Sequence, residues 1–181
     1  MPGIYIMSSE PQSGKTIAAL GIMETLAGRV HRPSVFRPLV REGDERDRLI
    51  NLLSSRYSLQ STYENMYGTT YARARELLTA HKHDDLYREI LERFRTLENS
   101  SDIVICIGTD YRSVSAALGF DFNIEVANNL GTPVMPIIKG YNRNPSLIVD
   151  IAKVLLNSLK DKGVELCLRS LPIKPRFNRS H

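Results

Sequence analysis

Residues 9–16 read Ser-Glu-Pro-Gln-Ser-Gly-Lys-Thr. Phosphate-binding loops follow the pattern G-x-x-x-x-G-K-[ST], which this stretch matches at its last three positions. Its first position is Ser9, where the pattern has glycine. The apolar run 4–7 precedes the stretch, and apolar residues at helical spacing follow Lys15. Since a P-loop joins a strand to a helix, the stretch predicts a phosphate-binding loop.

The predicted loop contains the groups that phosphate binding requires. Unpaired N–H groups at the start of a helix point outward, and the helix dipole favours an anion there. Ser13 and Gly14 would present such groups. Lys15 would supply a cation for the β- and γ-phosphates, and Thr16 a hydroxyl for Mg²⁺. Glu10 either faces this site or is solvated. The predicted ligands are phosphate or a nucleotide with Mg²⁺; the alternative is a Ser-Gly turn beside a solvated lysine.

A second metal-binding residue is expected at the end of a neighbouring strand, because P-loop enzymes usually hold Mg²⁺ with an acidic side chain there. Asp110 follows the apolar run Ile103–Ile107 and is the first candidate. It could equally be a turn residue that bonds nearby backbone N–H groups. Asp47 and Asp44 follow the second predicted strand, and for both a structural role is favoured, since Asp47 can stabilise the first turn of a helix.

The remainder of the chain alternates short apolar runs with helical patterns. This order predicts an α/β fold of the P-loop NTPase type, in which helices flank both faces of a parallel sheet. Ligands of such sheets bind beyond the carboxyl ends of the strands, so we expect the loops that follow the strands to share one edge. The predicted strands are 4–7, 34–36, 103–107, 134–138 and 164–168, and the predicted helices are 15–29, 46–57, 71–80, 84–98, 122–130 and 145–162.

The formal net charge of +4 is unevenly distributed. Residues 169–181 contain no acidic residue, whereas residues 1–168 are neutral by the same count. A neutral body argues against a nucleic-acid partner, which would require a basic face on the folded domain. We therefore predict a P-loop domain over residues 1–168, followed by a basic tail that is a truncated or artificial end. The tail's positive residues are Arg169, Lys174, Arg176 and Arg179.

The apolar runs and the cysteines indicate in which cellular compartment the chain is expected. No apolar run reaches the roughly 20 residues that span a bilayer, so no membrane association is expected. The first apolar run has no basic segment before it, unlike a signal peptide. Cys106 and Cys167 each lie in an apolar run, which favours buried thiols in a reducing cytoplasm.

Four short blocks of the sequence occur in the order found in one known family. They are residues 9–16 with 19–24, 35–38, 108–111, and 122–124 with 127–134. Together they resemble the N-terminal, dethiobiotin-synthetase-like P-loop domain of long-form bacterial phosphate acetyltransferase. The resemblance covers about residues 3–168, and it extends to dethiobiotin synthetase and the cobyrinic-acid amide ligases, which share this fold.

The resemblance implies a non-catalytic domain for regulation and assembly. In the family, a separate C-terminal phosphotransacetylase domain transfers the acetyl group between coenzyme A and phosphate. The implied partners are that domain, further copies of the chain in a homo-oligomer, and small-molecule metabolite effectors. The parent protein would be an acyltransferase, and we expect this chain alone to be inactive in acetyl transfer.

Three other functions remain open. An ATP- and Mg²⁺-dependent carboxylate ligase similar to dethiobiotin synthetase would hold ATP at Lys15 and Thr16 and the acid substrate at Arg37. A partitioning-type ATPase usually carries an additional lysine early in the loop, where this chain has Ser9 and Glu10. An unrelated binding module is the last alternative.

The chain departs from the active ligases at the loop, the metal site and the base site. Ser9 replaces the first glycine of the loop, and Ile107 stands where the ligases carry a glutamate. Residues 168–170 lack the asparagine with which the ligases bind the base. These departures predict that ATP turnover is slow or absent.

Overall fold

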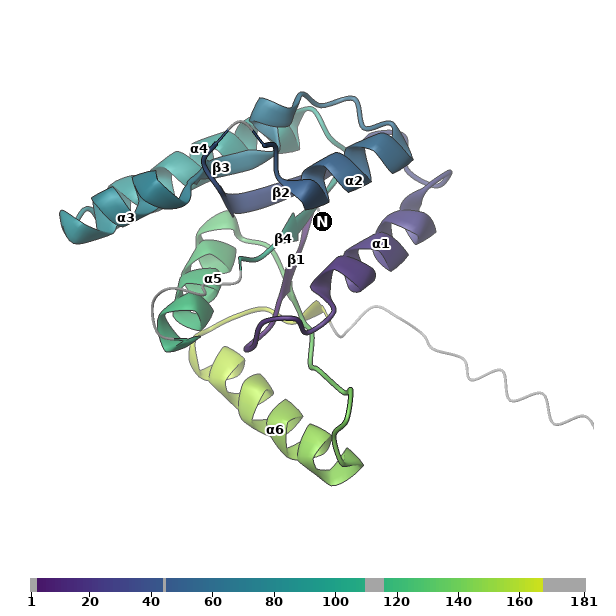
Figure 1. Ribbon diagram of the computed structural model, residues 1–181, viewed down its shortest axis with the longest axis vertical. Helices are drawn as coiled ribbons and strands as arrows, with labels where there is room; N and C mark the ends of the chain where they lie inside the picture. The colour runs from purple at the N-terminus through teal and green to yellow at the C-terminus, as the bar shows by residue number, and fades with distance from the viewer. Residues whose placement is uncertain (1–2, 44, 110–115, 168–181) are drawn as a thin grey trace, which may run out of the picture.

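The computed structural model describes residues 3–43, 45–109 and 116–167, and these form one parallel sheet flanked by helices (Figure 1). The five strands have the order β3-β2-β4-β1-β5. They are β1 (Gly3–Met7), β2 (Pro33–Val40), β3 (Tyr67–Thr70), β4 (Ile103–Ile107) and β5 (Val134–Pro136). The helices are α1 (Lys15–Leu26), α2 (Arg48–Tyr57), a short 3-10 turn (Tyr63–Asn65), α3 (Tyr71–Thr79), α4 (His83–Asn99), α5 (Ala116–Leu130) and α6 (Pro145–Asp161). The predicted fold class is confirmed.

Two hydrophobic cores lie on opposite faces of the sheet. Successive side chains of a strand point to opposite faces, so Tyr5 and Met7 enter one core and Ile6 enters the other. The first core also contains side chains from α3, α4, α5 and α6, and the second contains side chains from α1 and α2. Burial on both faces explains why the central strands are apolar throughout.

The carboxyl ends of three strands are aligned at one edge of the sheet. Ile6 of β1 lies beside Ile107 of β4, and Met7 of β1 lies beside Pro136 of β5. The segments that follow these strands therefore begin side by side. This is the edge where the sequence predicted the ligand site.

The predicted end of β2 before Arg37 and Pro38 is wrong, because the strand continues past both. The Arg37 N–H donates to the carbonyl of Met66 on the β3 side. Consecutive residues of a strand alternate in direction, so the nitrogen of Pro38 faces the β4 side. Pairing with β4 ends at Phe36, opposite Cys106. The missing N–H of proline therefore costs no sheet hydrogen bond.

Strand β3 was not predicted, because one tyrosine, one glycine and two threonines in a charged region do not form an apolar run. Gly68 is required there by close packing. A Cβ at Gly68 would lie 2.7 Å from the carbonyl oxygen of Pro38 and 3.0 Å from a side-chain carbon of Ile90. Gly68 thus lets β3 pack closely between β2 and α4. Because glycine is depleted in strands, the same residue makes β3 hard to predict from the sequence.

Several predicted ends are confirmed and others are shifted. Gly131 and Gly163 follow α5 and α6 with positive φ, and the side chain of Asn144 caps α6, as predicted. Helix α1 ends at Leu26, earlier than predicted, and β5 ends at Pro136. Of the predicted strand 164–168, the described residues form a single parallel bridge, between Val134 and Leu166.

The two cysteines, both predicted to be buried, differ in their exposure. Cys106 is fully buried, and burial raises the pKa of its thiol well above the usual value, whereas Cys167 is only partly buried. In the described ranges, every helix is too short or too polar to cross a bilayer.

Candidate functional site

The loop between β1 and α1 has the geometry of an anion-binding site. Gly14 is the N-cap of α1, and its φ of 98° lies in the left-handed region that glycine adopts without strain. A glycine cap contributes no side-chain acceptor, so the first N–H groups of the helix are not capped from that position. Those groups and the positive end of the helix dipole are directed to the carboxyl edge of the sheet.

The side chains of Ser13 and Lys15 add polar groups beside these N–H groups. The Ser13 hydroxyl is buried, and no hydrogen-bond partner for it is found among the described residues. Lys15 is only 6% exposed although it carries a charge. A buried hydroxyl donor and a buried cation at a helix start fit an anionic oxygen ligand, and a buried hydroxyl is costly to leave without a hydrogen bond. Thr16, at the second position of α1, is exposed.

Arg37 and Asp47 lie next to each other near the end of β4. Arg37 Nη1 donates to the carbonyl of Gly108 at 3.5 Å, and its Nε lies 3.6 Å from Asp47 Oδ2. Asp47 Oδ1 accepts hydrogen bonds from the N–H groups of Leu49 and Ile50 at 3.0 and 3.1 Å. Asp47 therefore caps α2, which is the structural role that the sequence favoured. Metal binding by Asp47 stays a prediction.

The other predicted metal ligands and base-site positions fall outside the described part of the chain. Asp44, Asp110 and residues 168–170 are among the residues that the structure leaves out. Within the described ranges there is no group of three or more acidic, histidine or cysteine side chains placed to hold a metal ion. Mg²⁺ binding by Thr16 and Asp110 is thus still a prediction. Ile107, where the ligases carry glutamate, is 1% exposed and packs in the core between the sheet and α1.

A buried hydrogen-bond network, which the sequence did not reveal, fixes the backbone after β4. Asn123 of α5 accepts through Oδ1 from the Tyr5 hydroxyl at 2.8 Å and from the Thr109 N–H at 2.9 Å. Its amide nitrogen donates to the carbonyls of Thr109 and Gly119 at 3.0 and 2.7 Å. Burial raises the pKa of Tyr5 well above its usual value, so its hydroxyl stays protonated as a donor. Gly108 is required here, since a Cβ would lie 2.5 Å from Asn123 Oδ1.

An ion pair that was also missed joins the P-loop to the segment between β5 and α6. Arg143 Nη1 donates to Glu10 Oε1 at 2.8 Å, and Nη2 donates to Oε2 at 2.6 Å. The sequence left Glu10 either facing the site or solvated, and the structure gives it this partner. The general expectation that loops following the strands share one edge was the only signal for the contact.

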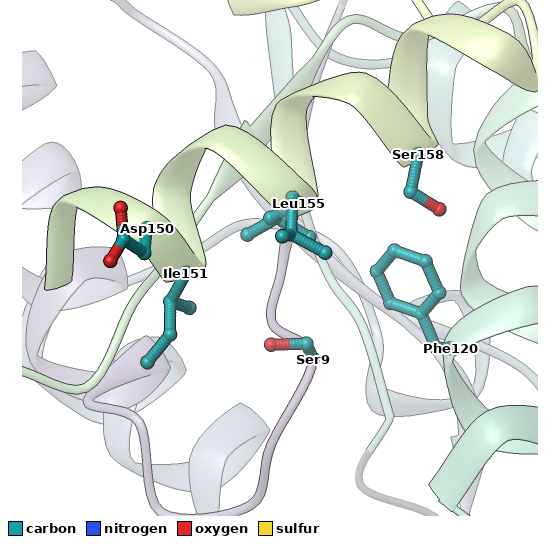
Figure 2. Close-up of a pocket in the computed structure, with 7 residues that line it drawn as sticks. Ser9, Phe120, Asp150, Ile151, Leu155 and Ser158 are labelled. Carbon is teal, nitrogen blue, oxygen red and sulfur yellow. The ribbon is translucent and has the colours of Figure 1, made fainter. Parts of the chain in front are cut away.

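A hollow of about 350 Å³ adjoins the start of the loop. Figure 2 shows Ser9 between Phe120 of α5 and the side chains of Ile151 and Leu155, which extend from α6. Its polar groups are the hydroxyls of Ser9 and Ser158 and one carboxylate. Such a lining offers no cation to a phosphate, so this hollow does not fit an anion. The lining residues are Ser9, Phe120, Asp150, Ile151, Val154, Leu155 and Ser158.

Comparison with known proteins gives one family and a set of longer relatives. A family model described as an AAA domain matches residues 2–167. The chain is 33% identical over 165 residues to a phosphate acetyltransferase of Nitratidesulfovibrio vulgaris, a match that covers 90% of this chain and 23% of that protein. It is 29% identical over 134 residues to a phosphate acetyltransferase of a Synechocystis species, covering 73% of this chain and 19% of that protein. The chain thus spans less than a quarter of these curated relatives. The resemblance inferred from the sequence blocks is confirmed.

Proposed function

The chain belongs to the AAA domain family with its P-loop, and on this premise we propose that it is a regulatory and assembly domain of a phosphate acetyltransferase. In this proposal it binds phosphate or a nucleotide at residues 13–16 and leaves acetyl transfer to a further domain. The observation that carries the binding part is the cradle of Gly14, Ser13 and Lys15, in which a buried hydroxyl and a buried cation meet a helix start. Cytoplasmic location is part of the proposal.

The chain's own residues account for binding without turnover. The N–H groups at the start of α1 and the Lys15 ammonium would hold phosphate oxygens, and Ser13 would donate one more hydrogen bond. Mg²⁺, when bound, would neutralise phosphate charge, with the Thr16 hydroxyl as its ligand from this loop. Ile107 is packed in the core, so the position where the ligases carry a glutamate holds an apolar side chain. This favours a binding domain over the ligase alternative.

We expect the purified 181-residue chain to release no coenzyme A from acetyl-CoA when phosphate is supplied. The reason is that it corresponds to 23% of the length of its acetyltransferase relative. We also expect ATP turnover with dethiobiotin-type substrates to stay well below the enzyme range of about 1–10³ s⁻¹. Coupled assays of both reactions, with a full-length phosphate acetyltransferase and a dethiobiotin synthetase as positive controls, test this. Phosphate-dependent release of coenzyme A would refute the first part, and ligase turnover in the enzyme range would favour the alternative.

The assembly part of the proposal is supported by apolar side chains on α6. Leu147 and Val154 are 48% and 70% exposed and, with Ile151 between them, recur at helical spacing along one side of the helix. Exposed apolar side chains grouped on one helix face favour contact with another polypeptide. We propose that this face takes part in the homo-oligomer.

Val154→Lys should therefore shift the chain from oligomer toward monomer, because a charge would be buried in the proposed contact. Val149→Lys is the matched control, since Val149 is 51% exposed on a different side of the same helix. Light scattering coupled to size-exclusion chromatography measures the mass of each variant. If both variants keep the mass of the unmodified chain, the α6 face is not the contact.

A further inference from the structure

The ion pair between Glu10 and Arg143 has the geometry of a strong interaction. Its two parallel N–H···O bonds, at 2.8 and 2.6 Å, match the fork of the guanidinium to both carboxylate oxygens. Each side chain is 24% exposed, so the pair is shielded from much of the solvent. An exposed pair on one helix, such as Arg88 with Asp85, is instead strongly screened and contributes little.

Both partners are held by ordered backbone. The N–H of Arg143 donates to the carbonyl of Gly140 at 3.3 Å, and the next residue, Asn144, caps α6. On the other side, the carbonyl of Glu10 accepts a hydrogen bond from the Ser8 hydroxyl at 2.5 Å. The pair therefore joins two fixed turns, at the ends of adjacent strands β1 and β5.

Glu10 presents an electrostatic problem for the proposed phosphate site. It is part of the same loop, residues 9–16, whose N–H groups and Lys15 would attract an anion. An unpaired carboxylate in that loop would repel a phosphate dianion, and the repulsion would be strong because little solvent screens it. Among the residues that the structure describes, Arg143 is the cation that pairs with Glu10 and neutralises its charge.

We propose that Arg143 is a positioning residue of the phosphate site, which neutralises the charge that Glu10 would otherwise place in the loop. This inference rests on the proposed phosphate-binding function. Arg143 acts through Glu10, so its removal matters because it leaves a negative charge in the loop. The effect of removing Arg143 should then depend on whether Glu10 is charged.

The test compares a single and a double variant, with calorimetry measuring the dissociation constant of inorganic pyrophosphate for the full chain. Arg143→Ala should weaken binding by about tenfold, the size expected for a lost charge-assisted interaction. Glu10→Gln combined with Arg143→Ala should return the affinity to within about threefold of the unmodified chain, since no unpaired carboxylate is left. Arg88→Ala, which removes the same charge from an exposed pair on α4, should leave the affinity unchanged.

The outcomes separate this inference from the function it rests on. If Lys15→Met binds pyrophosphate as tightly as the unmodified chain, the loop is not the site and the proposed function fails. If Lys15→Met binds weakly but Arg143→Ala binds normally, only the role of Arg143 is wrong. If Arg143→Ala weakens binding and the double variant binds pyrophosphate no more tightly than Arg143→Ala, Arg143 does not act by neutralising Glu10. Thermal unfolding of each variant distinguishes these results from a loss of folded protein, which would lower the melting temperature of both Arg143 variants equally.

Discussion

Replacing Asn123 with leucine is expected to lower the free energy of unfolding by about 3–5 kcal/mol, because buried polar groups lose their partners together. The Tyr5 hydroxyl and the Thr109 N–H both donate to Asn123 Oδ1, and the Thr109 carbonyl accepts from its amide nitrogen. Leucine has the same number and branching of side-chain heavy atoms but neither donor nor acceptor. Urea unfolding followed by circular dichroism measures the loss.

The same helix provides the control for this substitution. Asn129 is exposed on α5, and its amide donates only to the carbonyl of Glu125, at 2.8 Å, among the hydrogen bonds of the described residues. Asn129→Leu should therefore change the stability by no more than about 0.5 kcal/mol. Similar small losses for both variants would mean that the Asn123 network contributes little to the fold.

The parts of the fold that were predictable from sequence are those with strong local signals. Ile103–Ile107 is apolar at every position, and it forms the buried central strand β4. The Asn144-Pro145 pair places a side-chain cap before a proline at the first helical position, and α6 begins there. In these cases the local preference and the tertiary structure agree.

The parts that were missed depend on neighbours far away in the chain. The effect of Pro38 could be judged only once the pairing of β2 with β4 was known to end at Phe36. Gly68 reads as a helix or strand breaker until Ile90 and the β2 backbone are seen against it. No local pattern distinguishes these residues from ordinary loop residues.

The candidate site also has one part that was predictable from the sequence and one part that was not. The loop sequence predicted the cradle at Gly14 and Lys15, since a P-loop is a local motif. The contacts that complete its surroundings, from Asn123 and Arg143, come from segments more than 100 residues away from Tyr5 and Glu10. Sequence could place these segments near one edge of the sheet but could not pair their side chains.

Removing the charge of Lys15 is expected to weaken anion binding by about 1.5–3 kcal/mol, which is roughly a 10- to 150-fold rise in the dissociation constant. Lys15 is buried at the start of α1, where its charge is poorly screened and adds to the helix dipole. Lys15→Met keeps most of the length of the side chain and removes the ammonium, so packing is largely preserved. Lys160→Ala, at an exposed position near the end of α6, is the matched control for the loss of a positive charge.

Calorimetric titration of pyrophosphate into the unmodified chain, Lys15→Met and Lys160→Ala tests whether the loop at residues 13–16 is an anion site. We expect one site in the unmodified chain, the same affinity for Lys160→Ala, and at least about tenfold weaker binding for Lys15→Met. Equal affinities in all three proteins, or no binding by the unmodified chain, would contradict it.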